Sequence, residues 1–445
     1  MTTNSHPKNN IPGSYGYPIA GELFSLVTNE QLFYWKRYQK YGAIYKTSFL
    51  GKKTVIIAGP EINRAVLKDQ AYKFSSYSGW QGLEPLIGKG LLLQDGLEHQ
   101  HSRKLIFPAF SKCAISQYFT KIKSIVEDFL KEYCLDTDKK LISVSRALTL
   151  KIIINILLTS NHKIDIDKTS QLFHYLIDGM LAYIRLDIPF ITYGKALKAR
   201  RDLFDELEII VKDTQGKTLS HDDSSVIDFL VHSTDESGNS LSNNEIISQI
   251  FQLVLGGHET TAKLLCWTII MLSRHIDWQS KLRNEYYEVV GDSGLTVDHL
   301  PRLKLMDAVL KEVERLYPPL YFIPRGIISD FEFSGFTFTS DWLIHLSPLI
   351  THRMSSIYTN PHDFDPERFL PPREEHNRYP YSLIGFGGGK HFCLGNELAN
   401  VEMKIILATL ITNYSFDIFP NVYFDSICKG KRIANKFFFR TCTLH

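Results

Sequence analysis

The chain has 445 residues, of which 44% are hydrophobic and 22% charged, the composition of a globular protein with a large core. Fifty basic and 48 acidic residues leave a net charge of +2, so bulk charge gives no reason to expect nucleic acid or a membrane surface as partner. The six cysteines lie far apart without a C-x-x-C pair. This spacing argues against a zinc ribbon, a redox dithiol or a disulfide framework, and favours a reducing compartment.

No targeting or membrane segment is predicted. The N-terminal residues MTTNSHPKNNIPGSYGYPIAGELF lack a charged start followed by an apolar signal core. The longest apolar runs, such as Leu264 to Leu272, are about half as long as the ~18 residues of a membrane span. We therefore expect a cytoplasmic protein without a membrane anchor.

The first elements in chain order are an extended segment, a helix and a β-hairpin. Residues 10–20 are rich in Pro and Gly, and a helix is predicted near Asn29 to Tyr41. The following run IYKTSFLGKKTVIIAG alternates apolar and polar residues around a Gly-Lys turn, which is typical of a hairpin. From about Ile115 to Val290, helical periodicity dominates.

One helix in this region is unusually long. It opens at Ser242 with Glu245 three residues on, a capping box that satisfies free backbone donors at a helix start. Apolar residues continue to about Ile276. The predicted helix thus has roughly 33 residues and spans about 50 Å.

The last third mixes short elements. A helix from Asp307 to Leu316 ends before two prolines, because proline disfavours helical backbone in the residue before it. Short strands follow at Phe331 to Phe338 and Leu343 to Leu346, and a final helix starts just after Cys393. No repeat or low-complexity linker occurs. We predict a mainly α fold with a minor β region, as one domain over residues 1–445.

The segment FGGGKHFCLG, Phe386 to Gly395, is the most informative motif. Its glycines let the backbone bend tightly beside a flat ligand. Cys393 then lies at the start of a helix, where amide groups and the helix dipole favour a thiolate over a thiol. An isolated cysteine would instead be a small apolar core residue.

This F-x-x-G-x-x-x-C-x-G pattern resembles the haem-binding motif of the cytochrome P450 superfamily. The resemblance implies a single haem-binding domain in which Cys393 is the thiolate ligand of the iron of haem b, with Phe386 and His391 also contacting the haem. His391 would bind a propionate. A thiolate ligand favours O–O cleavage, whereas a histidine would favour oxygen carriage or peroxidase chemistry.

Two further motifs fall in the order that the family shows. Glu312-Val313-Glu314-Arg315 resembles its E-x-x-R helix, and Phe364 to Phe369, FDPERF, resembles its P-E-R-F segment. The resemblance implies that Arg368 closes a buried network with Glu312 and Arg315. This network would be structural, holding the loop beneath the haem.

The long helix carries GGHETT at 256–261, which resembles the family's A/G-G-x-D/E-T segment. Two mid-helix glycines cost about 1 kcal/mol each relative to alanine. The resemblance implies that the helix opens at Gly256-Gly257 beside the haem, with Gly257 in contact with it, and that Glu259 and Thr260 deliver protons to the reacting oxygen. Close helix packing at the glycines is the alternative.

Propionate partners are implied at two further places. His99 to Lys104, HQHSRK, resembles the family's helix that contacts the propionates, although many members have Trp where this chain has His99. Arg103, four residues on, would face the same side as His99. Arg325, after the two prolines, matches another usual propionate partner.

The substrate is expected to be a lipophilic small molecule. The family's pocket-lining segments are apolar and aromatic here, although each such residue is equally suited to the core: Phe74, Tyr77, Trp80, Leu86, Leu253, Leu320, Tyr321, Phe322 and Ile323. The overall pattern is similar to soluble bacterial members related to retinoid and sterol hydroxylases. An isoprenoid or similar natural product is therefore expected.

Electrons must come from separate proteins, since the chain has no flavin, NAD or iron–sulfur motif. A ferredoxin and its reductase are the expected donors to a monomeric monooxygenase. The alternatives are a peroxide-using or hydroperoxide-rearranging haem-thiolate enzyme, a non-catalytic haem sensor, and a haem-free helical protein. The Glu259-Thr260 pair argues against the first, and the glycine-rich loop before Cys393 against the last.

Overall fold

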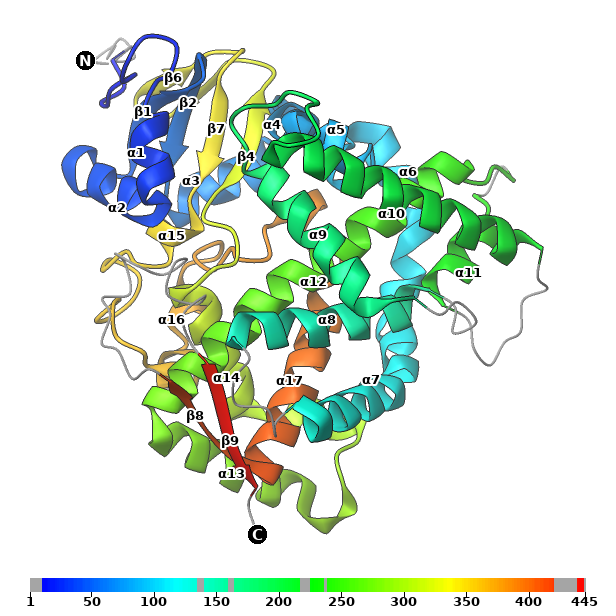
Figure 1. The fold of residues 1–445 in the computed structure, drawn as a ribbon. Helices are drawn as coiled ribbons and strands as arrows, with labels where there is room; N and C mark the ends of the chain where they lie inside the picture. Colours follow the sequence, from blue (N-terminus) through cyan, green and yellow to red (C-terminus); the bar gives the residue numbers. More distant parts are fainter. Residues whose placement is uncertain are drawn as a thin grey trace. The chain divides into compact units, whose positions relative to one another are not determined.

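The computed structural model describes residues 10–133, 140–158, 164–216, 225–235, 238–419 and 438–443. Cys134, Cys428 and the first nine residues lie outside these ranges. The chain divides into two units, each built from separate stretches of sequence. Among the described residues, the first comprises 10–80 and 304–393, and the second comprises those of 81–303, 394–419 and 438–443. The elements are labelled in Figure 1 and confirm the predicted mainly α fold with a minor β region.

The first unit holds the larger sheet. Its strands run in the order β1-β2-β7-β4-β3, with β2 and β7 parallel and the other pairs antiparallel. The elements of this unit are α1 (Leu23–Thr28), α2 (Glu30–Tyr41), β1 (Ile44–Phe49), β2 (Lys52–Ile57), α3 (Pro60–Arg64), β3 (Phe74–Ser75), α4 (Ser76–Trp80), α14 (Lys304–Leu316), β4 (Ile323–Ile327), β5 (Phe331–Phe333), β6 (Phe336–Phe338), β7 (Leu343–Leu346), α15 (Pro348–Thr351) and α16 (Glu375–Arg378).

The predicted hairpin forms, but its turn lies one residue earlier than expected. Leu50 and Gly51 both have positive φ, 49° and 78°, the backbone of a two-residue hairpin turn that matches strand twist. The predicted strand 331–338 is itself a hairpin, β5-β6, turning at Ser334 and Gly335 with φ of 52° and 78°. β4 was not predicted, because its sequence IPRGI contains both Pro and Gly and does not alternate.

The second unit is largely helical. Its elements are α5 (Glu84–Ile87), α6 (Gly96–Ile106), α7 (Lys112–Tyr133), α8 (Leu141–Leu157), α9 (Ile166–Met180), α10 (Thr192–Gln215), α11 (Val226–His232), α12 (Asn243–Arg274), α13 (Ile276–Val290), α17 (Asn396–Asn413), β8 (Tyr414–Phe419) and β9 (Phe438–Thr443). Within the described ranges, none of the helices has both the length and the apolar character needed to cross a bilayer.

The long helix α12 confirms the sequence prediction. It has 32 residues, and its capping box is complete: the Ser242 hydroxyl accepts from the Glu245 amide, and the Glu245 carboxylate accepts from the Ser242 amide. Most residues from Ile246 to Ser273 are buried, and α8 and α10 pack against it (Figure 1). A helix covered on several sides loses the one-sided apolar stripe of a surface helix.

A buried ion network ties α14 to the chain that follows α15. The Arg315 guanidinium donates two hydrogen bonds to the Glu312 carboxylate, at 2.6 and 2.8 Å. Arg368 reaches the same carboxylate at 3.2 Å and Glu375 at 2.8 Å. The Arg315, Arg368 and Glu312 side chains are fully buried. The predicted Glu312–Arg315–Arg368 network is thus present in the structure.

Arg315→Ala should destabilise the protein by about 3 to 5 kcal/mol, because it leaves Glu312 buried with one cation fewer. The change is measured as the free energy of unfolding in urea. The matched control is Lys311→Ala, which removes a half-exposed cation of the same helix paired with Asp307 at 3.1 Å and should cost less than about 1 kcal/mol. Equal effects of the two substitutions would contradict a structural role for the network.

Candidate active site

Cys393 ends a glycine loop of the first unit. Its amide donates to the Phe386 carbonyl at 2.9 Å, which closes the loop, and its side chain is exposed. Gly387 and Gly389 have φ of 75° and 63°, a backbone conformation that glycine adopts at no steric cost. A Cβ on Gly389 would lie 1.8 Å from a backbone oxygen of the neighbouring chain segment. The loop therefore depends on its glycines, and α17 begins three residues after Cys393, as predicted.

Two buried side chains that the sequence analysis missed hold the chain just before this loop. The Gly385 amide donates to Oε1 of Glu314 at 3.0 Å, and the Ile384 amide donates to Nε2 of His352 at 2.9 Å. A Cβ on Gly385 would meet Oε1 of Glu314 at 2.4 Å. Glu314 lies inside the E-V-E-R motif but was passed over, since residues two apart do not share a helix face.

Burial gives these two side chains unusual protonation. It raises the pKa of Glu314 to about 8, against the opposing effect of the Gly385 hydrogen bond. It lowers the pKa of His352 to about 3, helped by the charges of Arg315 and Arg353. Near neutral pH, Glu314 is therefore largely an uncharged acid and His352 a neutral imidazole. His352 can then accept from Ile384 at Nε2 while Nδ1 donates to the Arg315 carbonyl.

The residues of this unit fit a haem. Cys393 presents an accessible sulfur, and the glycines on its loop leave the backbone bare of side chains. Arg325 in β4 is a buried cation suited to a propionate. His391 lies partly buried in the loop. Cys266, by contrast, is fully buried in α12, and burial raises the pKa of its thiol far above the usual range, so it is not a thiolate ligand.

In the second unit, Glu259 is held in a cluster of charges. Arg146 of α8 donates two hydrogen bonds of 2.8 Å to its carboxylate, and Nζ of Lys263 lies 3.2 Å away. Burial alone would raise the pKa of Glu259, but Lys263 and Arg146 together lower it to about 2. Glu259 is therefore an ionised, buried carboxylate at neutral pH.

The two glycines of α12 have different surroundings. A Cβ on Gly257 would meet Ile153 of α8 at 2.9 Å, whereas Gly256 is exposed with nothing within 4 Å of such an atom. Gly257 thus serves helix packing, the alternative to an opening of the helix, and Gly256 faces open space. The helix continues through both residues. The helix shows no break at the predicted opening, where the Thr260 hydroxyl donates a hydrogen bond to the Gly256 carbonyl one turn back.

The predicted propionate partners of the second unit both lie on α6. His99 is buried and Arg103 partly buried. Their four-residue separation places them on the same side of the helix, as expected. The sequence prediction of a helix around these residues is thus confirmed by α6, while their binding role stays a prediction.

Two of the expected pocket residues pack against other aromatic rings. Phe74 packs edge-on against Phe331, with ring centroids 5.3 Å apart. Phe322 stacks on His345 at 4.5 Å and on Trp80 at 6.3 Å. These contacts agree with the core alternative for Phe74 and Phe322, and their lining of a substrate pocket stays a prediction.

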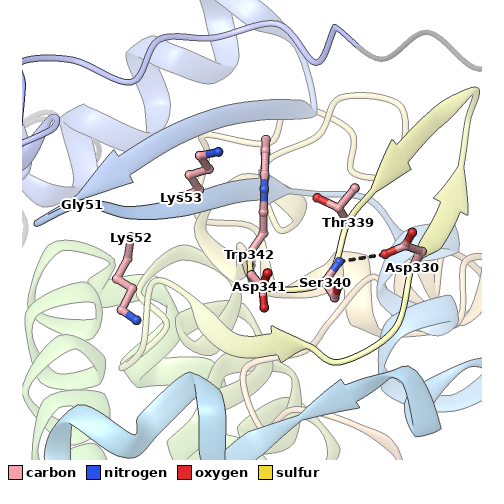
Figure 2. A pocket seen from close by; sticks show the side chains of 8 residues that line it. All are labelled: Gly51, Lys52, Lys53, Asp330, Thr339, Ser340, Asp341 and Trp342. Atoms are coloured by element: carbon pink, nitrogen blue, oxygen red, sulfur yellow. Dashed lines mark hydrogen bonds between the residues drawn. The ribbon is translucent and has the colours of Figure 1, made fainter.

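A surface cavity of about 550 Å³ lies beside the β1-β2 turn (Figure 2). Lysines and aspartates flank an indole there, and the lining residues are Gly51, Lys52, Lys53, Asp330, Thr339, Ser340, Asp341 and Trp342. These residues include none of the predicted site residues. The lining is charged and polar around a single aromatic ring, unlike the apolar pocket expected for a lipophilic substrate.

Comparisons with known proteins agree with these motifs. The family model described as Cytochrome P450 matches residues 11–436. Putative cytochrome P450 120 of Synechocystis sp. is 30% identical over 414 residues, covering 92% of this chain and 91% of that protein. Cytochrome P450 26B1 of Homo sapiens is 27% identical over 426 residues, covering 92% and 83%. The solved structure of retinoic acid bound cyanobacterial CYP120A1 has a TM-score of 0.87 at 28% identity, covering 98% of this chain and 99% of that one.

Glu314→Gln should change how stability depends on pH. Folded Glu314 keeps its proton up to pH about 8, whereas the unfolded carboxyl releases it near 4.5. The carboxyl's contribution to the free energy of unfolding is therefore complete below pH 4.5 and is lost as pH rises to about 8, by at most about 1.4 kcal/mol per pH unit. Glutamine keeps the acceptor for Gly385 without titrating.

The measurement is urea unfolding of both proteins at pH 5, 6.5 and 8. Relative to wild type, Glu314→Gln should gain stability as pH rises. Other titrating groups are common to both proteins and cancel in the difference. A difference that does not vary with pH would contradict a protonated Glu314.

Proposed function

Because the chain belongs to the cytochrome P450 family of haem-binding monooxygenases, we propose that Cys393 is the thiolate ligand of its haem b iron. The observation that carries this assignment is the exposed thiol at the end of a loop whose glycines are required by positive φ and by close backbone contact. We assign Phe386 to the face of the haem. Arg325, His391, Arg103 and His99 are assigned to its propionates.

Haem with a thiolate ligand supplies the oxidising chemistry: it activates dioxygen with two electrons and leaves one oxygen atom in the product. The protein's own residues deliver the protons that this chemistry needs. We propose that the Thr260 hydroxyl, bonded to the Gly256 carbonyl, holds a water at the exposed face of α12. We place the contact of α12 with the haem at Gly256 rather than at Gly257, because Gly256 is the one of the two with open space beside it.

Glu259 is proposed to link that water to solvent. Its pKa of about 2 means that it is charged at rest, so it can hold a proton only transiently. Its partners Arg146 and Lys263 are 21% and 27% exposed. The Lys263 ammonium can exchange protons with bulk water, whereas the Arg146 guanidinium stays protonated and holds the carboxylate in place.

The proposed substrate is a lipophilic small molecule, a retinoid or other isoprenoid. Support comes from the cyanobacterial relative with a TM-score of 0.87, whose solved structure has retinoic acid bound. We further propose that a ferredoxin and its reductase supply electrons, and that residues 1–445 act as one monomeric cytochrome P450 domain in the cytoplasm. A peroxide-driven enzyme would not need the Thr260 hydroxyl.

The ligand assignment predicts the spectrum of the reduced, carbon-monoxide-bound protein. Its main absorption should lie at the long wavelength that thiolate ligation produces, and Cys393→His should lose this band. Cys113→Ser, which alters another exposed cysteine, is the control and should keep it. A wild-type spectrum of the histidine-ligated kind would refute the assignment.

Thr260→Ala should uncouple electron use from product formation. Removing a positioned proton donor costs on the order of 10²- to 10⁴-fold, but protons can still leak in from solvent, and two of them with two electrons reduce dioxygen to hydrogen peroxide. The variant should keep haem and substrate binding, but most of the electrons from the reductant should reduce dioxygen to hydrogen peroxide. Reductant consumed, peroxide released and product formed are measured with the retinoid or terpenoid that shifts the ferric spectrum.

Two further variants complete the test. Glu259→Gln should slow reductant consumption itself, because it restricts proton entry. Thr261, about 100° further round the helix, is buried, and Thr261→Ala should stay coupled. If Thr260→Ala kept wild-type coupling, the relay would have to be reassigned, with neighbouring His258 or a hydroxyl of the substrate as the next candidate.

A further inference from the structure

The cavity beside the β1-β2 turn has no part in the proposed function. Its volume of about 550 Å³ lies within the range of small-molecule sites, and all of its lining residues belong to the first unit. Trp342 supplies the one aromatic ring among these residues. Figure 2 shows this indole between Lys53 and Thr339. The cavity is therefore an aromatic ring surrounded by polar side chains.

Trp342 is held in a fixed position. Its ring packs edge-on against Tyr15, with centroids 6.1 Å apart, and also packs against the buried core of the larger sheet. The Trp342 carbonyl accepts from the Ile327 amide at 2.9 Å, and the Asp341 amide donates to the Ile327 carbonyl at 3.3 Å. Asp341 has a φ of 77°, a conformation that a non-glycine residue keeps only where the surrounding structure imposes it. The indole is thus a preformed platform for a ligand.

The polar groups around the indole offer both donors and acceptors. The lining contains two lysines and two aspartates, so its charges are equal and opposite. Asp330 is fixed, since its Oδ1 accepts from the Ser340 amide at 2.9 Å and its carbonyl accepts from Nζ of Lys73 at 3.0 Å. In the described part of the chain none of the four charged side chains of the lining forms an ion pair. Their hydrogen-bonding groups therefore remain available to a ligand.

These surroundings select a class of ligand. Nζ of Lys53 lies 5.9 Å from the centroid of the Trp342 ring, which disfavours an organic cation there, and the two aspartates disfavour an anion. A sugar ring has a C–H face that can cover an aromatic ring, and hydroxyls that both donate and accept hydrogen bonds. We propose that Trp342 and the polar side chains around it bind a neutral saccharide. This site is independent of the haem assignment.

The test follows the indole N–H signals of the haem-loaded protein labelled with ¹⁵N-tryptophan. The chain has five tryptophans, and the signal of Trp342 is the one that disappears in Trp342→Phe. Maltose and methyl β-D-glucopyranoside should shift this signal in a saturable way and leave the other four in place. Co-sedimentation with phosphatidylcholine vesicles that carry a glucosyl lipid distinguishes a lipid headgroup from a free sugar as the bound form.

Trp342→Ala should weaken saccharide binding, measured by calorimetry, about tenfold, the factor that 1.4 kcal/mol produces. Trp342→Phe should keep part of the affinity, because a phenyl ring still offers a face. Lys53→Met lies at an exposed position, so it tests the site without disturbing the core, and it should also weaken binding. The matched control is Trp35→Ala, which removes a partly buried indole of α2 that packs against Tyr38 and His362 and should leave the affinity unchanged.

Charged ligands of similar size decide between this class and its alternatives. Glucose 6-phosphate, glucosamine and glycine betaine should each bind no more tightly than maltose. Tenfold tighter binding of any of them would make the cavity an ion site and overturn the inference. So would the absence of binding both to the free sugars and to the glucosyl lipid, or an equal loss of affinity in Trp35→Ala and Trp342→Ala.

Discussion

The structure around Cys393 depends on two carboxyl groups of α14 that are buried in opposite states. Glu312 is ion-paired with Arg315 and Arg368, whereas burial raises the pKa of Glu314 to about 8. A buried charge is tolerated only with partners, and a carboxyl without a cation becomes neutral instead. Glu312 accepts a hydrogen bond from Arg368 and so joins the chain around Arg368 to the helix. Glu314, the neutral acid, accepts a hydrogen bond from the Gly385 amide. One helix thus positions two loops, the second of which leads directly into the glycine loop of Cys393.

In the second unit, a buried carboxylate is stabilised by two cations rather than by protonation. Glu259 lies in the middle of a buried helix, yet Arg146 and Lys263 keep its pKa at about 2. Breaking one buried partner typically costs about 3 to 5 kcal/mol, so the cluster is structural as well as a candidate proton route. The neighbouring Thr260 carries no charge, and its hydroxyl is bonded to a carbonyl one turn back. The ion-paired carboxylate of Glu259 and the hydroxyl of Thr260, which can exchange its proton, are therefore neighbours on α12.

Long periodic elements and strong caps were predictable from sequence, and irregular geometry was not. The capping box of Ser242 and Glu245 marked the start of α12 correctly, because both partners lie within four residues. The buried network was predicted only through the resemblance, since E-x-x-R alone is common on helix surfaces. His352 and Glu314 were missed because their partners, Ile384 and Gly385, are distant in sequence. Contacts of this range are decided by tertiary packing and leave no local pattern.

The two glycines of α12 both match the family's motif, but each is a glycine for a different physical reason. Both were expected to serve an opening of the helix beside the haem. Only Gly256 faces open space, and the contact of Gly257 with Ile153 explains its small size by packing between α8 and α12. That packing carries Arg146 of α8 close enough to reach Glu259 with two hydrogen bonds. A larger residue at 257 would therefore act on the proton route indirectly, by displacing α8 and with it the cation that keeps Glu259 charged.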